Sequence, residues 1–361
     1  FILKGKFNFM SDKKTTYREH TDMENTLKLR QVLATLPPFC KDYFRAIDTT
    51  TTAKTRISYA YDIRIFFQFL LDENPAFKDH AMTDFTVDVL DQIKAVDLEE
   101  YQEYLKLYQS GDKTETNGER GLKRKISALR SFYAYYYKRE MIHTNPTVLI
   151  DVPKIHEKSI IRLDTDEVAM LLDYIEHCGD TLTGQKRVFY EKTKERDLAI
   201  VTLLLGTGIR VSECVGLDIE DVDFKNNGIK VTRKGGNEMV VYFGPEVEKA
   251  LKRYLEVREG ITPLAGHEHA LFYSAQRKRI GVQAVENMVK KYSRQITTTK
   301  KITPHKLRST YGTALYQETG DIYLVADVLG HKDVNTTKKH YAALDDARRR
   351  QAATAVKLRE E

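Results

Sequence analysis

Apolar residues recur at helical spacing along most of this chain, and this periodicity constrains its fold more than any other feature. In the segment AKTRISYAYDIRIFFQFLLD, apolar side chains fall four residues apart at Ile57, Tyr61, Ile65 and Phe69. That spacing is typical of a helix with one buried face. The segment 96–109 repeats the pattern. We therefore predict a mostly helical protein.

The segment RGLKRKISALRSFYAYYYKRE is also predicted to be an amphipathic helix. Its apolar side contains Leu122, Ile126, Leu129, Phe132, Tyr133 and Tyr136. Its opposite side contains the cations Lys123, Arg124 and Arg130. These cations are candidates for contacts with a polyanion, but a solvated helix face explains each of them equally well.

A proline-punctuated connector, HTNPTVLIDVPKI, divides the chain into two domains. We predict a flexible segment at residues 1–34, followed by an all-helical domain at 35–150 and a linker at 151–160. A second domain at 161–345 and a C-terminal helix at 346–361 follow the linker.

The second domain is predicted to be rich in helices, with one small antiparallel sheet. Residues 164–178 begin with Asp and Thr, which are common helix caps, and residues 195–208 are predicted to form a buried helix that ends at a glycine. Residues 228–244 instead alternate β-branched side chains around Gly235 and Gly236. Such alternation around a glycine pair predicts a β-hairpin.

The composition limits the partners and the compartment. The 361 residues contain 58 Lys and Arg against 52 Asp and Glu, a net charge of +6. This small excess permits a polyanion partner only at a local basic patch. The three cysteines, Cys40, Cys178 and Cys214, are far apart and odd in number, which argues against a disulfide framework and a zinc site and fits a reducing cytoplasm. No apolar stretch has the length of a membrane span.

Six residues that could carry chemistry, and one acidic residue beside them, occur in short motifs of the second domain. They are Arg210 and Glu213 in GTGIRVSE, Lys234 in TRKGGN, His305 and Arg308 in PHKLR, His331 in LGHKD, and Tyr341 in TTKKHY. Each is weak alone, because an Arg–Glu pair three apart is usually a surface salt bridge and a lone Tyr in a helix usually packs.

Together these side chains suit phosphoryl transfer without a metal ion. Guanidinium groups bind phosphate oxygens and keep their charge. A tyrosine oxygen can attack phosphorus and form a covalent intermediate, and a lysine can protonate the leaving alkoxide. Fixed cations then stabilise the charge that develops at the phosphate.

In this order, the motifs resemble the tyrosine recombinase (phage integrase) family, in particular its Xer-like bacterial members. The resemblance spans about residues 36–345 and includes SALRSFYAYY, LLLGTGIRVSECVGLDIEDVD and ITPHKLRSTYGTALYQETGD. Tyr341 lies ten residues after His331, where nine is the commoner spacing of the family.

The resemblance implies a role for each candidate. Arg210 and Arg308 bind the scissile phosphate, with Glu213 in support. Lys234 is the general acid, His305 and His331 complete the phosphate pocket, and Tyr341 is the nucleophile. No cofactor and no metal are expected.

The resemblance also implies how such a protein assembles. The two domains close around duplex DNA at specific recombination sites, with residues 35–150 as the core-binding domain and 161–345 as the catalytic domain. The protein is a monomer or dimer off DNA and a homotetramer in the synaptic complex, where the 346–361 helix docks on a neighbouring protomer or packs on its own domain. The expected location is the bacterial cytoplasm, at the nucleoid.

Three alternatives remain at this point. The acidic string DIEDVDF suggests a metal-dependent nuclease, although a solvated turn explains it better. A catalytically silent DNA-binding protein would share the fold. A type IB topoisomerase would share the chemistry but relax DNA without exchanging strands.

The first prediction separates this chemistry from a metal-dependent nuclease. Cleavage of target DNA should persist in excess EDTA, because fixed cations replace the metal ion at the phosphate. Gel analysis of nicked DNA with and without EDTA measures this. Loss of cleavage in EDTA, restored by added Mg²⁺, would support the nuclease instead.

Overall fold

The computed structural model describes residues 16–156, 160–233, 236–331, 333–335 and 337. The chain divides into two compact units, residues 1–157 and 158–361. The division falls within the segment predicted as a linker. The predicted C-terminal helix lies outside the described residues.

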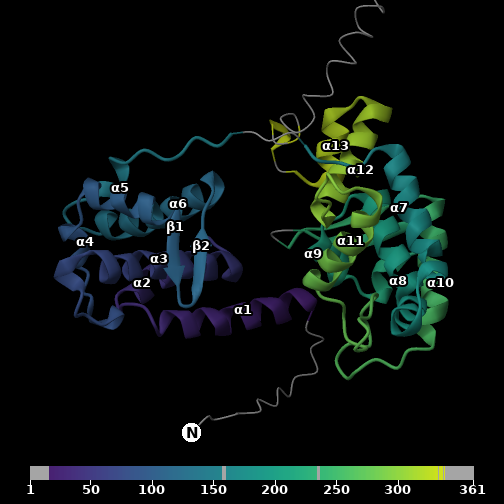
Figure 1. Cartoon of the computed structure of the whole chain (residues 1–361), viewed down its shortest axis with the longest axis horizontal. Coiled ribbons are helices and arrows are strands. Elements are labelled where there is room, and N and C mark those ends of the chain that lie inside the picture. Colours follow the sequence, from purple (N-terminus) through teal and green to yellow (C-terminus); the bar gives the residue numbers. More distant parts are fainter. Residues whose placement is uncertain (1–15, 157–159, 234–235, 332, 336, 338–361) are drawn as a thin grey trace, which may run out of the picture. The chain divides into compact units, whose positions relative to one another are not determined.

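The N-terminal unit consists of helices and one short hairpin (Figure 1). Its α-helices are α1 Tyr17–Leu33, α2 Cys40–Ala46, α3 Ala53–Glu73, α4 Val89–Gln92, α5 Ala95–Tyr104 and α6 Glu119–Lys138. Its 3₁₀ turns are η1 Pro75–Phe77, η2 Met82–Asp84 and η3 Pro146–Val148. The strands β1 Leu107–Ser110 and β2 Lys113–Thr116 pair antiparallel.

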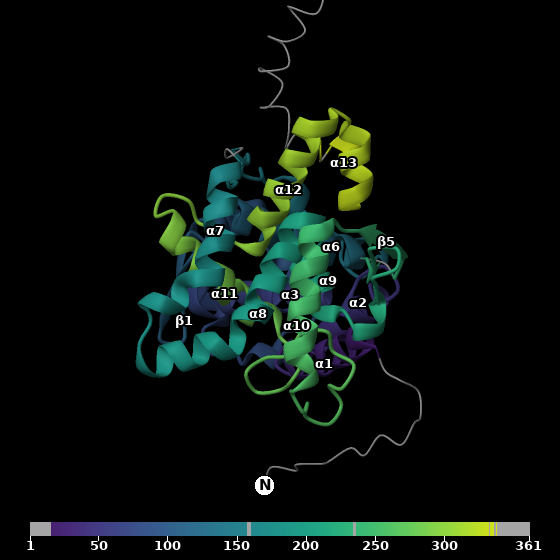
Figure 2. The same cartoon turned by 90° about the vertical axis from the view of Figure 1, so that its right-hand side faces the viewer.

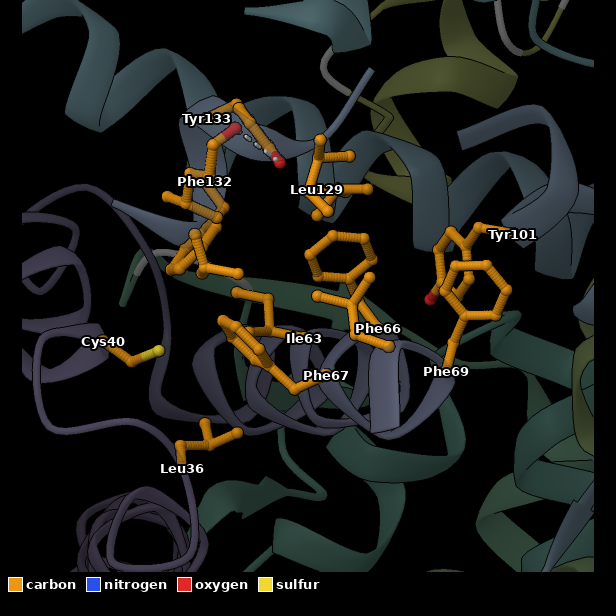
Figure 3. Close-up of a cluster of buried hydrophobic side chains, with 14 of the residues drawn as sticks. Leu36, Cys40, Ile63, Phe66, Phe67, Phe69, Tyr101, Leu129, Phe132 and Tyr133 are labelled. Carbon is orange, nitrogen blue, oxygen red and sulfur yellow. Dashed lines mark hydrogen bonds between the residues drawn. The ribbon is translucent and has the colours of Figure 1, made fainter. Parts of the chain in front are cut away.

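Aromatic rings from α3, α5 and α6 form the centre of this unit's core (Figure 3). The ring of Phe66 meets Tyr101 edge to face with centroids 5.3 Å apart, and Phe67 meets Phe132 in the same manner at 6.3 Å. Edge-to-face pairs stabilise a core beyond the area they bury. This core holds α3 against α6.

The two predicted amphipathic helices exist, but the buried face of α3 differs from the prediction. All six apolar residues predicted to face inward from α6 are buried. On α3, Phe69 is buried as expected, whereas Tyr61 is exposed, and Ala60, Ile63 and Phe67 face the core instead. This helix has apolar residues on more than one face, so spacing alone selects the wrong stripe.

The prediction of a flexible segment over residues 1–34 is wrong for α1. Thr16 caps this helix in a reciprocal pair with Glu19, and Leu29 and Val32 are buried in the core. The helix packs along α3. Few apolar residues anchor it to the core, and this is why its sequence appears polar.

The N-terminal domain also departs from the predicted all-helical structure at its hairpin. Strands β1 and β2 occupy part of the segment expected to be a helix end and a polar loop. Gly111, with φ of +59°, lies in the connecting turn, and the side chains of β2 are all exposed. A hairpin of mostly exposed residues lacks the apolar alternation by which strands are recognised.

The C-terminal unit is also mainly helical. Its α-helices are α7 Thr165–His177, α8 Gly184–Thr207, α9 Val211–Gly216, α10 Pro245–Glu259, α11 Val282–Ile296, α12 Pro304–Thr319 and α13 Ile322–Leu329. It also contains η4 Cys178–Thr181, η5 Ile219–Asp221 and the strands β3 Val222–Asp223, β4 Gly228–Thr232 and β5 Glu238–Tyr242. The strands form one antiparallel sheet in the order β3-β4-β5.

Helix α8 is the centre of this unit, and α7, α10 and α12 all pack against it (Figure 2). Its apolar second half is buried, and it ends at Gly208 in the left-handed conformation, as predicted. Strands β4 and β5 form the predicted hairpin, with Gly228 opposite Tyr242 at its open end and Thr232 opposite Glu238 next to the connection between the strands. The mostly helical fold with small antiparallel sheets is thus confirmed.

No helix of the described residues is long and apolar enough to cross a membrane. The three cysteine side chains are buried, and burial raises the pKa of the Cys214 thiol to about 12. A thiol in this state reacts slowly.

The packing of α1 yields the second prediction. Leu29→Ala should lower the free energy of unfolding by about 3 kcal/mol, because it leaves a cavity in the core. Leu27→Ala, two residues away in the same helix, should cost less than about 0.5 kcal/mol, since Leu27 is 59% exposed and Leu29 only 4%. Urea unfolding followed by circular dichroism measures both. Equal effects would show that α1 is not packed on the core.

Candidate active site

Arg210 begins a short helix and is bonded to a carboxylate one turn ahead. Its backbone N–H donates to Glu213 Oε2 at 2.8 Å, and its Nη1 donates to Glu213 Oε1 at 2.7 Å. The side chain of Glu213 is 6% exposed, so this carboxylate is shielded from water. The charge-assisted bonds therefore hold the Arg210 guanidinium in one orientation.

Arg308, on α12, is buried and bonded to the ends of two other helices. Its Nη1 donates to the carbonyl of Gly208, which follows α8, and its Nη2 donates to the carbonyl of Leu329, the last residue of α13. Only 4% of the residue is exposed. Carbonyls at helix C-termini lack intrahelical partners and carry partial negative charge, so they suit a buried cation.

Gly208 makes this contact possible. Its φ is +63°, a conformation that favours glycine, and a Cβ at this position would overlap the ring of Tyr311 and approach Leu329 to 2.9 Å. The chain then turns within two residues from the end of α8 to Arg210. The carbonyl of Gly208 therefore holds Arg308 while the turn places Arg210.

A second glycine turn leads from α13 to His331. Gly330 is left-handed, with φ of +63°, and the backbone N–H of His331 donates to the carbonyl of Ala326 at 2.9 Å. His331 Nδ1 lies 2.7 Å from Thr337 Oγ1, and Thr337 is fully buried. The imidazole is thus tied to the segment that leads toward position 341.

The two predicted phosphate-binding arginines meet at this turn. Arg210 Nη2 donates to the carbonyl of Gly330 at 3.3 Å, and Arg308 donates to the preceding carbonyl, that of Leu329. Because these carbonyls are consecutive, both guanidinium groups are bonded to the turn that immediately precedes His331. The structure therefore brings together residues that are up to 121 positions apart.

A third arginine, Arg233, reaches the same turn and was not among the predicted residues. It follows β4, and its guanidinium donates to the carbonyls of Asp327, at 3.1 Å, and Val328 near the end of α13. Its sequence signal was slight, since nothing in TRKGGN shows toward which element an arginine beside a hairpin turn will point.

The electrostatics of this cluster favour an anion. Burial lowers the pKa of Arg233, an effect that the carboxylate of Glu213 opposes and the charge of Arg210 reinforces. An arginine keeps its proton despite such a shift. Three guanidinium groups therefore share the turn with the carboxylate of Glu213 and the exposed carboxylate of Asp327, and positive charge is in excess.

His305 lies one turn before Arg308 on α12, but it is exposed. It borders a hollow of about 340 Å³. The other residues that line this hollow are Val211, Gln283, Glu286, Asn287, Lys290, Thr303 and Pro304. Val211 is the sequence neighbour of Arg210, but neither Arg210 nor Arg308 lines the hollow.

Lys234 and Tyr341 lie outside the described residues. The residues that flank Lys234 are described: the backbone N–H of Arg233 donates to Asn237 at 2.8 Å, and that of Gly236 donates to Arg233 at 3.0 Å. In the sequence, position 234 lies between β4 and β5.

In the N-terminal unit, the three cations predicted to contact DNA differ in their surroundings. Lys123 is exposed. Arg124 pairs with the buried carboxylate of Asp62, whose pKa is raised by burial while Lys125 and Arg124 oppose the shift. Arg130 donates to the carbonyls beyond α6, at Thr147 (3.0 Å) and Ile150 (2.7 Å). Arg124 and Arg130 thus have structural partners.

The acidic string that suggested a nuclease is engaged in local bonds. Asp218 pairs with Arg279, Glu220 pairs with His269, and Asp223 accepts from the backbone of the following turn. No group of three or more His, Cys, Asp or Glu among the described residues is arranged to hold a metal ion.

Comparison with known proteins identifies a family and similar relatives. The model of the phage integrase family matches residues 161–348, more than half of the chain. The tyrosine recombinase XerC of Caldanaerobacter subterraneus subsp. tengcongensis is 33% identical over 336 residues, which cover 90% of this chain and 88% of that protein. The tyrosine recombinase XerS of Lactococcus lactis subsp. cremoris is 31% identical over 338 residues, covering 87% and 93% respectively.

The fold is also similar to a solved structure, that of the Tn1549 transposon integrase in complex with circular intermediate DNA. The TM-score is 0.60 at 21% identity, and the match covers 84% of this chain and 94% of that one. At this identity the likeness establishes the fold.

The glycine turn yields the third prediction. Gly330→Ala should destabilise the protein by roughly 2–4 kcal/mol, because a left-handed alanine is strained and its Cβ would overlap the guanidinium of Arg233. Gly266→Ala is the matched control: Gly266 has φ of +84° but nothing within 4 Å of an added Cβ, so it should cost only about 1 kcal/mol. Thermal unfolding measures both. Equal losses would show that displacing Arg233 from this turn adds no cost.

Proposed function

Because this chain belongs to the phage integrase family and is a tyrosine recombinase that acts on specific DNA sites, we propose that Tyr341 is its nucleophile and that Arg210 and Arg308 bind the phosphate it attacks. The observation that carries the proposal is the meeting of both guanidinium groups on the consecutive carbonyls of Leu329 and Gly330. The chain reaches Tyr341 eleven residues later.

The arginines act by pre-organisation. The carbonyl bonds of Arg308 and the carboxylate of Glu213 beside Arg210 orient both guanidinium groups before DNA binds. Groups already aimed at the phosphate need no reorganisation as negative charge develops in the transition state. This is why fixed cations can replace a divalent ion, and no cofactor is required.

In the cleavage step, the Tyr341 oxygen forms a bond to phosphorus, and the bond from phosphorus to the 5′-oxygen breaks. Lys234 donates a proton to that oxygen, which leaves as a 5′-hydroxyl. His331 and His305 bind the phosphate and accept the tyrosine proton. The products are a 3′-phosphotyrosyl link and a free 5′-hydroxyl.

In the rejoining step, the 5′-hydroxyl of the partner strand attacks the phosphotyrosine. The new phosphodiester bond replaces the tyrosyl bond, and the phenolate regains its proton. One bond forms for each that breaks, so the reaction needs no ATP. Two such exchanges form and then resolve a Holliday junction.

The remaining roles follow from the same family. We assign residues 35–150 to DNA binding, with exposed Lys123 as a phosphate contact, and residues 161–345 to catalysis. The functional assembly is a homotetramer on two duplex DNA sites, joined by the helix at 346–361, and it acts in the cytoplasm at the nucleoid. Solved relatives named as recombinase–DNA complexes support the DNA partner.

The fourth prediction tests the nucleophile. Wild-type protein should form an SDS-resistant adduct with nicked suicide DNA, and Tyr341→Phe should form none, because phenylalanine has no oxygen to attack phosphorus. Tyr323→Phe, which alters an exposed tyrosine of α13, should form as much adduct as wild type. Denaturing gels and mass spectrometry of the linked peptide measure this. An adduct at another residue, or none while DNA is bound, would contradict the assignment.

A further inference from the structure

Arg233 joins two parts of the C-terminal unit that are distant in sequence. Its backbone closes the β4–β5 hairpin through the bond to Asn237. Its guanidinium crosses to α13 and donates to the carbonyls of Asp327 and Val328. One residue therefore fixes the turn of the hairpin to the C-terminal end of a helix.

The receiving end of α13 is suited to this contact. Its last carbonyls carry partial negative charge, which a guanidinium fork can satisfy. The carbonyl of Asp327 also accepts from the backbone N–H of Gly330 at 2.8 Å, so it receives two donors. Gly330 leaves the required space, because a Cβ there would occupy the position of the Arg233 guanidinium. The contact between Arg233 and α13 therefore requires a residue without a Cβ at position 330.

The contact of Arg233 with α13 also has an energetic cost. The Nε of Arg233 is buried and has no hydrogen-bond partner among the described residues. A buried donor without a partner is unfavourable.

The next residue in the chain is Lys234, the general acid of the proposed function. We propose that Arg233 is a positioning residue for Lys234: it ties the hairpin turn to the same end of α13 that receives Arg210 and Arg308. The inference rests on the proposed function. A general acid must lie within hydrogen-bond reach of the leaving oxygen, and a hairpin tip tied down at one residue meets that requirement better than a loose one.

The fifth prediction uses the chemistry of the leaving group. In one DNA substrate the bridging 5′-oxygen is replaced by sulfur. A thiol has a pKa of about 8.5, far below that of an alcohol, so a thiolate leaves without a general acid. A defect confined to Lys234 should therefore shrink on the sulfur substrate, whereas a defect in phosphate binding should not.

Arg233→Ala should slow single-turnover cleavage of ordinary DNA by roughly ten- to hundredfold. This is a fraction of the roughly 10²–10⁴-fold rate enhancement that a general acid supplies. On the sulfur substrate the loss should fall below about threefold. Lys234→Ala should show the same pattern with a larger loss. Arg233→Lys keeps the charge but not the two-pronged guanidinium fork, so it should give an intermediate defect that the sulfur substrate also relieves. This variant replaces Arg233→Ala in the test if the alanine variant does not fold.

Arg258→Ala is the matched control. Arg258 also clamps backbone carbonyls, at Ala270 and Leu271 (both 3.1 Å), but none of its bonds reaches the α13 turn. This variant should lower the melting temperature and affect both substrates equally.

Two outcomes would overturn the inference in distinguishable ways. If sulfur rescues Lys234→Ala but not Arg233→Ala, or if Arg233→Ala has no defect, Arg233 does not position the acid and the proposed function stands. If sulfur fails to rescue Lys234→Ala, Lys234 is not the general acid, and both proposals fail at that residue.

Discussion

The C-terminal unit depends on one buried cation. Arg308 needs acceptors because a charge removed from water is costly unless it is hydrogen-bonded. It finds them at Gly208 and Leu329, the C-terminal ends of two helices. Each acceptor lies two residues before a predicted catalytic residue, Arg210 in one case and His331 in the other. Neutralising one buried charge therefore also places the neighbouring groups of the site.

The site concentrates positive charge that a purely structural cluster would avoid. Arg210, Arg233 and Arg308 all donate to carbonyls of one helix end and its turn. Helix C-termini offset part of the repulsion among them, and Glu213 offsets more. The remaining positive charge is stabilised when an anion binds, and a phosphodiester is the anion on which a tyrosine recombinase acts. The cluster thus lowers the stability of the protein without DNA, and in return it is complementary to the phosphate of bound DNA.

The N-terminal unit shows where reading the sequence succeeds and where it stops. Helix α6 was predicted together with its buried apolar residues, since these recur at helical spacing along one side. The buried face of α3 was not, because apolar residues occur around much of that helix and only its neighbours decide which are covered. Helix α1 was missed since two buried residues, Leu29 and Val32, do not make a pattern.

For the active site, the sequence alone determined the residue types, their order and the chemistry they permit, because those are properties of single side chains and short motifs. It also determined the β4–β5 hairpin, through local alternation and glycines. Only the tertiary structure decided that Arg233 turns toward α13 and that Arg308 is buried between two helix ends. Those contacts join positions about 90 and 100 residues apart. Which carbonyl a long, flexible arginine side chain reaches depends on how the helices pack, and the local spacing of residues does not encode that packing.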